Sequence, residues 1–273
     1  MELTGLDLTI IASYMVAVTL IGVLLTKRAA KSVDSYLLGG KSLPWYLLGL
    51  SNASGMFDIS GTMWLVTLGF VYGLKSIWIP WLWPTFNQIF LMVFLSAWLR
   101  RSNVRTGAQW IETRFGKGRG SDLSHTIVVV FAIISALGFL AYGFIGLGKF
   151  VEIFIPWEVV QPYLGIHVSP EYVPHLYGIV FTLVAVIYTI LGGMTSIVLA
   201  DVLQYTIMTV SAIVVAAIAM VALSQTPLNV PDGWLNPFFG WELGLDWSGI
   251  IPEVNQKIAD DQFSLFTIFF MMM

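Results

Sequence analysis

The sequence predicts an all-α, polytopic helical membrane protein. Only 11% of its 273 residues are charged, and the mean hydropathy is +0.82; soluble domains carry about 25% charged residues. The apolar residues gather in runs of roughly 20, which is the length that a helix needs to cross about 30 Å of hydrocarbon. Because backbone amides cannot stay unpaired in lipid, these runs are expected to be helices. A soluble or secreted protein is therefore excluded.

Six apolar runs and the start of a seventh are expected to cross the membrane. The first run is not a signal peptide, because acidic residues precede it and Lys27 and Arg28 follow it. Gly192 and Gly193 separate the fifth and sixth runs, which predicts a tight turn between antiparallel helices. The expected spans are residues 7–26, 45–72, 76–99, 124–148, 173–192 and 195–222, and a seventh begins near Gln262.

The basic residues predict the orientation of these spans. Ten of the 13 lie in two short segments, 27–41 and 100–119. Alternation of the spans places both segments on one side, and the positive-inside rule makes that side cytoplasmic. We therefore expect a multi-pass protein of the cell (inner) membrane with its N-terminus outside. The chain ends inside an apolar run, 269–273, which predicts that the sequence is the N-terminal fragment of a longer protein.

Thiol and metal chemistry have little support in the composition. The sequence has no cysteine, and its three histidines lie far apart, in expected loops or helix ends. No disulfide, transition-metal site or organic cofactor is therefore expected. A membrane-embedded hydrolase is also disfavoured, because no histidine or cysteine lies in the core of a span to act as a nucleophile or base.

The second span carries an unusual polar stretch. Eight of the twelve residues in 51–62 are Gly, Ser, Asn, Thr or Asp, and Asp58 lies 13 residues after Trp45, about 20 Å along a helix and near the bilayer midplane. A carboxylate there costs at least ~2.5–3.5 kcal/mol. Local unwinding would free backbone carbonyls for sodium. Two alternatives stay open: a small-residue packing face with a hydrogen-bonded or protonated Asp58, and a proton relay.

A second carboxylate, Asp201, lies one to two turns inside the predicted cytoplasmic end of the sixth span. Asp201 and Gln204 are three residues apart and share a helix face. The pair could form an ion relay at the inner mouth of a pathway. An equally good interpretation is a carboxylate near a helix start, favoured by the helix dipole and wetted by the interface.

Four segments together resemble the sodium:solute symporter family, which includes sodium/proline and sodium/glucose cotransporters. Residues 36–45 are similar to the family's Y-x-L-G-G-R/K-S entry to its first core helix, with Lys41 at the basic position. Residues 58–61 match the D-x-S-G pattern of proline-type members. Segments 106–116 and 188–204 resemble, respectively, a cytoplasmic T-x-x-x-[YF]-x-x-x-R-[FY]-G motif and the Y-T-x-x-G-G signature that ends in D-x-x-Q.

The resemblance implies a LeuT-like fold of two inverted five-helix repeats preceded by an extra helix. On that scheme residues 1–26 hold the extra transmembrane helix and residues 27–222 the complete first repeat. Residues 223–261 form an extracellular or periplasmic loop, and residues 262–273 begin a second repeat that is truncated.

The resemblance also implies site residues. Sodium would be held by the carbonyls of Met56 and Ile59, with Asp58 and Ser60 beside them and further hydroxyls on a later helix. Asp201 matches an acidic position that the family uses in cation coupling. The substrate-binding candidates are Thr62, Trp64, Gln88 and Tyr142. The stretch 81–84 departs from the family pattern, so the identity of the solute cannot be transferred.

The expected function is sodium-coupled import of a small organic solute such as a sugar, amino acid or organic acid. The expected partners are sodium, the solute and the lipid bilayer, without nucleic acid, and no enzymatic activity is expected. The alternative is a symporter-like membrane input domain of a sensor histidine kinase, in which a kinase domain would follow the last span.

Overall fold

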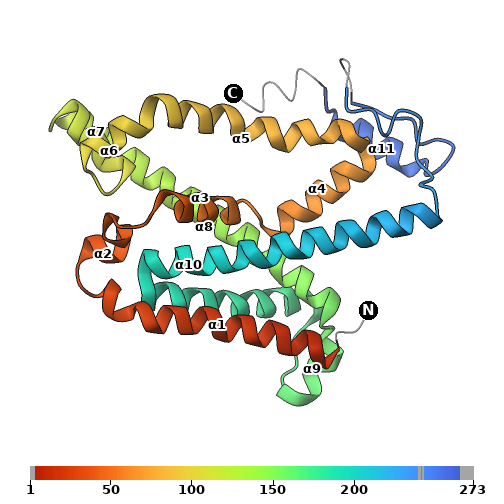
Figure 1. The fold of residues 1–273 in the computed structure, drawn as a ribbon, viewed down its shortest axis with the longest axis horizontal. Helices are drawn as coiled ribbons and strands as arrows, with labels where there is room; N and C mark the ends of the chain where they lie inside the picture. Colours follow the sequence, from red (N-terminus) through yellow and green to blue (C-terminus); the bar gives the residue numbers. More distant parts are fainter. Residues whose placement is uncertain (1–3, 239–240, 242, 265–273) are drawn as a thin grey trace. The chain divides into compact units, whose positions relative to one another are not determined.

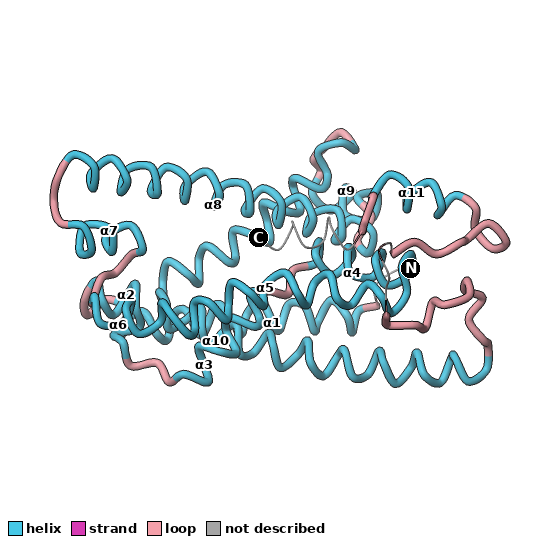
Figure 2. Tube along the Cα trace, turned by 90° about the horizontal axis from the view of Figure 1, so that it is seen from above, coloured by secondary structure: helices cyan, strands magenta, loops and turns pink. Residues whose placement is uncertain are grey.

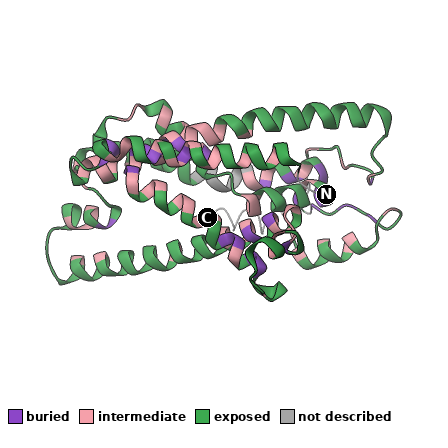
Figure 3. Ribbon diagram, turned by 90° about the horizontal axis from the view of Figure 1, so that it is seen from below, coloured by how far each residue is buried: buried purple, intermediate pink, exposed green. Residues whose placement is uncertain are grey.

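The computed structural model describes residues 4–238, 241 and 243–264, with the backbone alone for residues 81–86. All the regular elements of the described chain are helices (Figure 2). Most of the helical surface is exposed, and buried residues are confined to short stretches (Figure 3). The exposed side chains include many large apolar ones, such as Phe131 and Phe139, as expected for helices that face lipid. The all-α, polytopic fold class is confirmed.

Four of the described helical segments are long and apolar enough to cross a membrane. They are Gly5–Ala29, Ile59–Pro80, Arg119–Phe154 and Pro170–Gln225. The last is 56 residues long, about 84 Å if it were straight, so it supplies two of the predicted spans. The predicted span 76–99 is also helical throughout, from Trp78 to Ser102. It is divided by a π-helical turn into α5 (Trp78–Phe90), η3 (Leu91–Leu95) and α6 (Ser96–Ser102).

The chain forms two compact units. Unit 1 comprises Met1–Ser60 and Arg105–Ile213, and unit 2 comprises Gly61–Val104 and Val214–Met273. Unit 1 contains α1 (Gly5–Ala29), α2 (Val33–Leu38), η1 (Gly39–Lys41), α3 (Trp45–Gly55), α7 (Gly107–Phe115), α8 (Arg119–Phe154), α9 (Trp157–Leu164), η4 (Pro170–Tyr172) and most of α10 (Val173–Gln225). Unit 2 contains most of α4 (Ile59–Tyr72), η2 (Gly73–Ile77), α5, η3, α6 and α11 (Glu253–Asp261).

The second predicted span is broken, as the polar stretch predicts. Helix α3 ends at Gly55 and α4 begins at Ile59 (Figure 1). The amides of Met56 and Phe57 turn back onto the carbonyls of Ala53 and Ser54, at 3.2 and 3.0 Å. This closes the last turn of α3 with the tighter bonds that commonly end a helix. Residues 56–58 therefore lie outside both helices.

Helix α10 turns back on itself at Gly193, which confirms the predicted turn. The backbone there has φ 57° and ψ −155°, a conformation that glycine adopts at little cost. A Cβ at Gly193 would lie 2.7 Å from the carbonyl of Tyr36, so α2 packs closely against the turn. The Tyr36 hydroxyl donates a hydrogen bond to the Ile190 carbonyl at 3.2 Å. The two halves run in opposite directions (Figure 1).

Small residues let the helices of unit 1 approach closely. A Cβ on Gly22 of α1 would meet the backbone of Tyr188 at 2.9 Å, and one on Gly148 of α8 would meet the Pro174 carbonyl at 1.8 Å. Close backbone approach at small residues is the usual way that membrane helices pack. Beyond Gly148, a buried cluster joins α8, α9 and α10. It consists of Val151, Trp157, Val173 and Tyr177.

In unit 2 the segment after α10 folds back onto the end of α4. The indole nitrogens of Trp234 and Trp247 donate to the carbonyls of Phe70 and Val71, each at 2.9 Å. These carbonyls belong to the last turn of α4, where no intrahelical donor remains. The Tyr72 hydroxyl donates to Asp261 at 2.9 Å. Within the predicted loop 223–261, residues 226–238 and 243–261 thus form a packed cap that contains α11. The predicted seventh span lies almost wholly outside the described residues.

Candidate functional site

The break in the second span brings two helix ends of opposite polarity to the same place. The carboxyl end of α3 carries a partial negative charge and free carbonyls, and the amino end of α4 carries a partial positive charge and free amides. Met56 and Phe57 lie between them with exposed side chains, outside the helical hydrogen-bond pattern. Broken helices of this kind bind cations at the carbonyl end and anions at the amide end.

Ile59 differs from Met56 in its backbone environment. It is the first residue of α4, so the helical pattern already engages its carbonyl with an amide one turn later. A carbonyl oxygen has two lone pairs, and the second remains available to a cation. The two predicted carbonyl ligands are therefore unequal, since Met56 is outside the helix and Ile59 inside it.

Asp58 immediately precedes α4, the N-cap position, where a carboxylate is stabilised by free amides and by the helix dipole. Its side chain also interacts with the Tyr142 hydroxyl of α8, which hydrogen-bonds to Ser60 as well. Ser60 Oγ sits against Gly146, one turn along α8, where a Cβ would come within 1.7 Å of it. Unit 1 thus gathers Asp58, Ser60 and Tyr142 at the break.

Asp201 lies on the second half of α10 and is half-buried. Its Oδ2 accepts a hydrogen bond from the Ser51 hydroxyl of α3. It also interacts electrostatically with Tyr188 and with Tyr14 of α1. Gln204, on the predicted shared face, instead approaches the sulfur of Met208 at 3.9 Å. Asp201 is thus hydrogen-bonded to α3, before the break. Tyr142 interacts with Asp58 and Ser60, where the chain enters α4.

The remaining substrate-binding candidates belong to unit 2. Thr62 and Trp64 lie on α4 and Gln88 lies on α5, and all three side chains are exposed. Tyr142, 48% exposed on α8 of unit 1, is the substrate candidate that contacts the predicted sodium residues within that unit.

Three participating residues were not found from the sequence. Ser51 and Tyr14 lie near Asp201, and Gly146 lies under Ser60. In the sequence, Ser51 is only one of several small polar residues in 51–62, and its hydrogen-bond partner Asp201 lies 150 residues further along the chain. Gly146 is one of several small residues in the fourth span, which indicates close helix packing in general but not a contact with Ser60.

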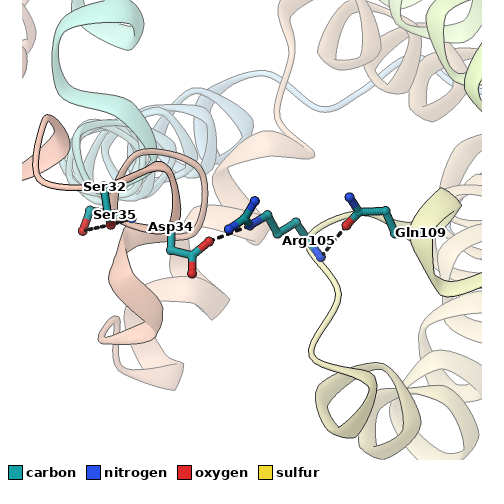
Figure 4. A network of polar contacts seen from close by, with 5 residues as sticks. All are labelled: Ser32, Asp34, Ser35, Arg105 and Gln109. Carbon is teal, nitrogen blue, oxygen red and sulfur yellow. Dashed lines mark hydrogen bonds and ion pairs between the residues drawn. The ribbon is translucent and has the colours of Figure 1, made fainter. Parts of the chain in front are cut away.

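A separate polar network joins residues 32–35, in the first basic segment, to residues 105–109, in the second (Figure 4). Arg105 Nε contacts Asp34 Oδ1 at 2.7 Å, and the Arg105 amide donates to Gln109 Oε1 at 3.1 Å. Ser32 caps α2 by accepting from the Ser35 amide at 3.0 Å. The ion pair is about half exposed, so it contributes roughly 0–1 kcal/mol.

The comparisons with known proteins assign the chain to a family. The model of the sodium:solute symporter family matches residues 36–230. The chain belongs to that family. The family is one of sodium:solute symporters, and the long apolar helices of this chain fit an integral membrane protein.

Individual relatives are more distant. The sodium/proline symporters of Staphylococcus aureus strains Newman, JH9 and USA300 are each 26% identical over 256 residues, which is 86% of this chain and 46% of theirs. The symporter-family chain thus spans about half the length of the curated relatives it matches. No solved structure matches it.

Proposed function

We propose that the complete protein is a sodium-coupled symporter that imports a small organic solute. The observation that carries this proposal is the interruption of the helix at residues 56–58, with Asp58 and Ser60 at its edge and Tyr142 against them. An interrupted helix in a membrane is tolerated where it lines a cavity. Family membership makes sodium the first ion to consider.

In this proposal the sodium ion is held at the carbonyl end of the break. The ligands from this chain are the carbonyls of Met56 and Ile59, with Asp58 and Ser60 beside them. Neutral carbonyl and hydroxyl oxygens suit a hard cation, and the carboxylate supplies the balancing charge. Further hydroxyl ligands are expected from a later helix of the second repeat, as the resemblance implies. Asp201 acts in coupling, closer to the predicted cytoplasmic end.

The solute would bind next to the ion. Tyr142 is suited to contact both, because its hydroxyl already bridges Asp58 and Ser60. Thr62, Trp64 and Gln88 belong to unit 2 and stay candidates on the resemblance alone. Proline is the first solute to assay, because the relatives above are named as sodium/proline symporters.

The competing functions are weaker. The comparisons give no support to the input domain of a sensor kinase, since the relatives above are named as symporters. A proton relay through Asp58 makes a different prediction from sodium coupling, because transport would then follow a proton gradient. The same assay separates the two ions.

The test is uptake of radiolabelled solute into proteoliposomes of the complete protein, driven by a sodium gradient. We expect Asp58→Ala to reduce sodium-driven uptake at least about a hundredfold, because the ion site loses its balancing charge. Asp122→Ala, on the exposed first turn of α8, is the matched control and should transport normally. Uptake that ignores the sodium gradient, or that survives Asp58→Ala, would contradict the proposal.

A further inference from the structure

The cap of unit 2 is fastened to both sides of the corner between α4 and α5. Helix α4 ends at Tyr72 and α5 begins at Trp78, with η2 between them. On the α4 side, the indole nitrogen of Trp247 donates to the Val71 carbonyl at 2.9 Å. On the α5 side, the indole nitrogen of Trp78 donates to the Pro237 carbonyl of the cap at 2.7 Å. The cap therefore holds the last turn of one helix and the first residue of the next.

Trp234 of the cap fits directly into this corner. Its indole nitrogen donates to the Phe70 carbonyl, and its own carbonyl accepts from the Leu74 amide, each at 2.9 Å. A Cβ at Gly73 would lie 2.2 Å from the Trp234 carbonyl oxygen, and the φ of Gly73 is 64°. Both the close approach and the positive φ require a glycine at this position.

A small buried core joins the same three parts. Leu68 and Tyr72 from α4, Ile79 from α5 and Leu243 from the cap are all buried in it. Partly buried residues of α11 pack against this core, and α11 lies beside the corner (Figure 1). Apolar burial and indole hydrogen bonds thus act together to fix the angle at which α4 meets α5.

The two helices that meet at this corner carry three of the four solute-binding candidates. Thr62 lies ten residues before Tyr72, and Gln88 lies ten residues after Trp78, so each is about 15 Å from the corner along its helix. A change of about 10° in the angle at the corner would displace either residue by roughly 3 Å. Binding groups must be held within about 0.5 Å, so this angle matters for a solute that contacts both helices.

We propose that Trp78, Trp234 and Trp247 are positioning residues for solute binding, because through the cap they fix the angle between α4 and α5. None of the three needs to touch the solute. This inference rests on the proposed function, since it is the proposed solute site that the corner positions. The segment between α10 and the predicted seventh span is then part of the binding machinery and not only a connection.

The test is the distance between spin labels on the two helices, measured on the complete protein by pulsed electron paramagnetic resonance. The labels are attached to cysteines that replace the exposed residues Met63 of α4 and Ile89 of α5. We expect one narrow distance distribution in the parent. Combining Trp78→Phe with Trp247→Phe removes two donors, and each lost hydrogen bond shifts an equilibrium by about two- to tenfold. The distribution should therefore broaden.

Transport provides the second readout, with radiolabelled proline as the probe. The combined variant should raise the KM for proline about tenfold, because the solute candidates are no longer held in one arrangement. The maximum rate and the half-saturating sodium concentration should stay near those of the parent, since the break is unchanged. A general loss of folded protein would instead lower the maximum rate and leave the KM unchanged.

Two controls separate positioning from general loosening. Trp241→Phe changes a well exposed tryptophan of the same segment and should alter neither the distance distribution nor the KM. A second pair of labels, at the exposed residues Val16 of α1 and Leu183 of α10, reports the fold of unit 1. That pair should give the same distance in every variant.

Two results would overturn the positioning role: the parent's distance distribution in the combined variant, or a broadened distribution with an unchanged KM for proline. If the parent takes up no proline, the distance measurement alone decides. If Asp58→Ala abolishes sodium-driven uptake while the combined variant keeps the parent's distribution, only the positioning role is wrong. If uptake survives Asp58→Ala, the proposed function is wrong whatever the distances show.

Discussion

Ser60, at the break, lies closely against Gly146 of α8. A Cβ on Gly146 would come within 1.7 Å of Ser60 Oγ, and within 3.1 Å of Ser60 Cβ. A hydroxyl can rotate away from such a collision, whereas the backbone of α8 cannot easily shift. A methyl group at residue 146 therefore redirects the Ser60 hydroxyl without removing it.

This contact gives a residue-scale prediction. We expect Gly146→Ala to raise the half-saturating sodium concentration about tenfold, because Ser60 Oγ would leave its present position. Gly143→Ala, on the same helix with nothing within 4 Å of its new Cβ, should behave like the wild type. Both changes improve helix propensity by about 1 kcal/mol, so a difference between them in sodium-dependent uptake reports the contact. Equal sodium dependence would contradict a role for Ser60.

At the same scale, the sequence predicted which polar residues would interrupt the helix but not what they would touch. Asp58 and Ser60 stood out because charged and small polar groups are expensive in hydrocarbon. Their partner Tyr142 was a candidate for the solute, and its contact with Asp58 was not foreseen. Contacts between helices far apart in sequence depend on how each helix is rotated about its axis, and a single sequence does not specify that rotation.

The cap on α4 is an element that depends on a few tryptophans. Trp247 is completely buried, and its indole nitrogen donates to Val71. We expect Trp247→Phe to destabilise the cap by about 1–3 kcal/mol, because the Val71 carbonyl loses its donor. Limited proteolysis of the cap should then be faster than in the wild type.

Trp241→Phe is the matched control, because Trp241 is 79% exposed and should tolerate the change. If both variants are cleaved at the wild-type rate, the indole contact does not hold the cap.

The same cap contains a turn that depends on a charged carboxylate. Asp246 Oδ1 accepts hydrogen bonds from the Ser248 hydroxyl at 2.6 Å, the Ser248 amide at 3.0 Å and the Asn255 side chain at 3.3 Å. The hydrogen bonds from Ser248, and then that from Asn255, hold the pKa of Asp246 below its usual 3.8. Because these bonds favour the charged form, the carboxylate stabilises the folded turn most when it is ionised.

The stability of the cap should therefore depend on pH. The lowered pKa means that this stabilisation is complete above 3.8 and is lost as the pH falls through the folded value. Cleavage of the cap by pepsin should therefore accelerate between about pH 5 and pH 2, relative to Asp246→Asn at each pH. That variant keeps an acceptor oxygen but has no charge to titrate in this range. A constant ratio of the two rates would contradict the prediction.

At the scale of elements, the break and the turn were predicted from the sequence, and the cap was not. The break followed from polar residues within an apolar run, and the turn from two adjacent glycines. The predicted loop 223–261 does contain a sign of packing, because Trp234 and Trp247 are large aromatic residues in a polar segment. Such residues need a partner for the indole N–H when they are buried.

For the whole molecule, the distribution of basic residues predicts the orientation. Thr113 lies on α7, just before α8, and Ser169 lies after α8, beyond α9. If α8 crosses the membrane with the basic end inside, a cysteine at residue 169 should react with an impermeant maleimide in intact cells. A cysteine at residue 113 should react only after the cells are opened. The reverse pattern would contradict the positive-inside assignment.

The family and the helical fold class were also predictable at this scale, because composition and four motifs are properties of the chain alone. The LeuT-like arrangement of two inverted repeats stays a prediction, as do the domain boundaries.

The turn at Gly193 has a consequence for biosynthesis. The two halves of α10 leave no polar loop between them, and the sequence has no lysine or arginine between Lys149 and Lys257. During translation the translocon therefore meets this pair without a local positive charge to orient it. The pair should enter the bilayer as one hairpin, with a direction inherited from the helices made before it.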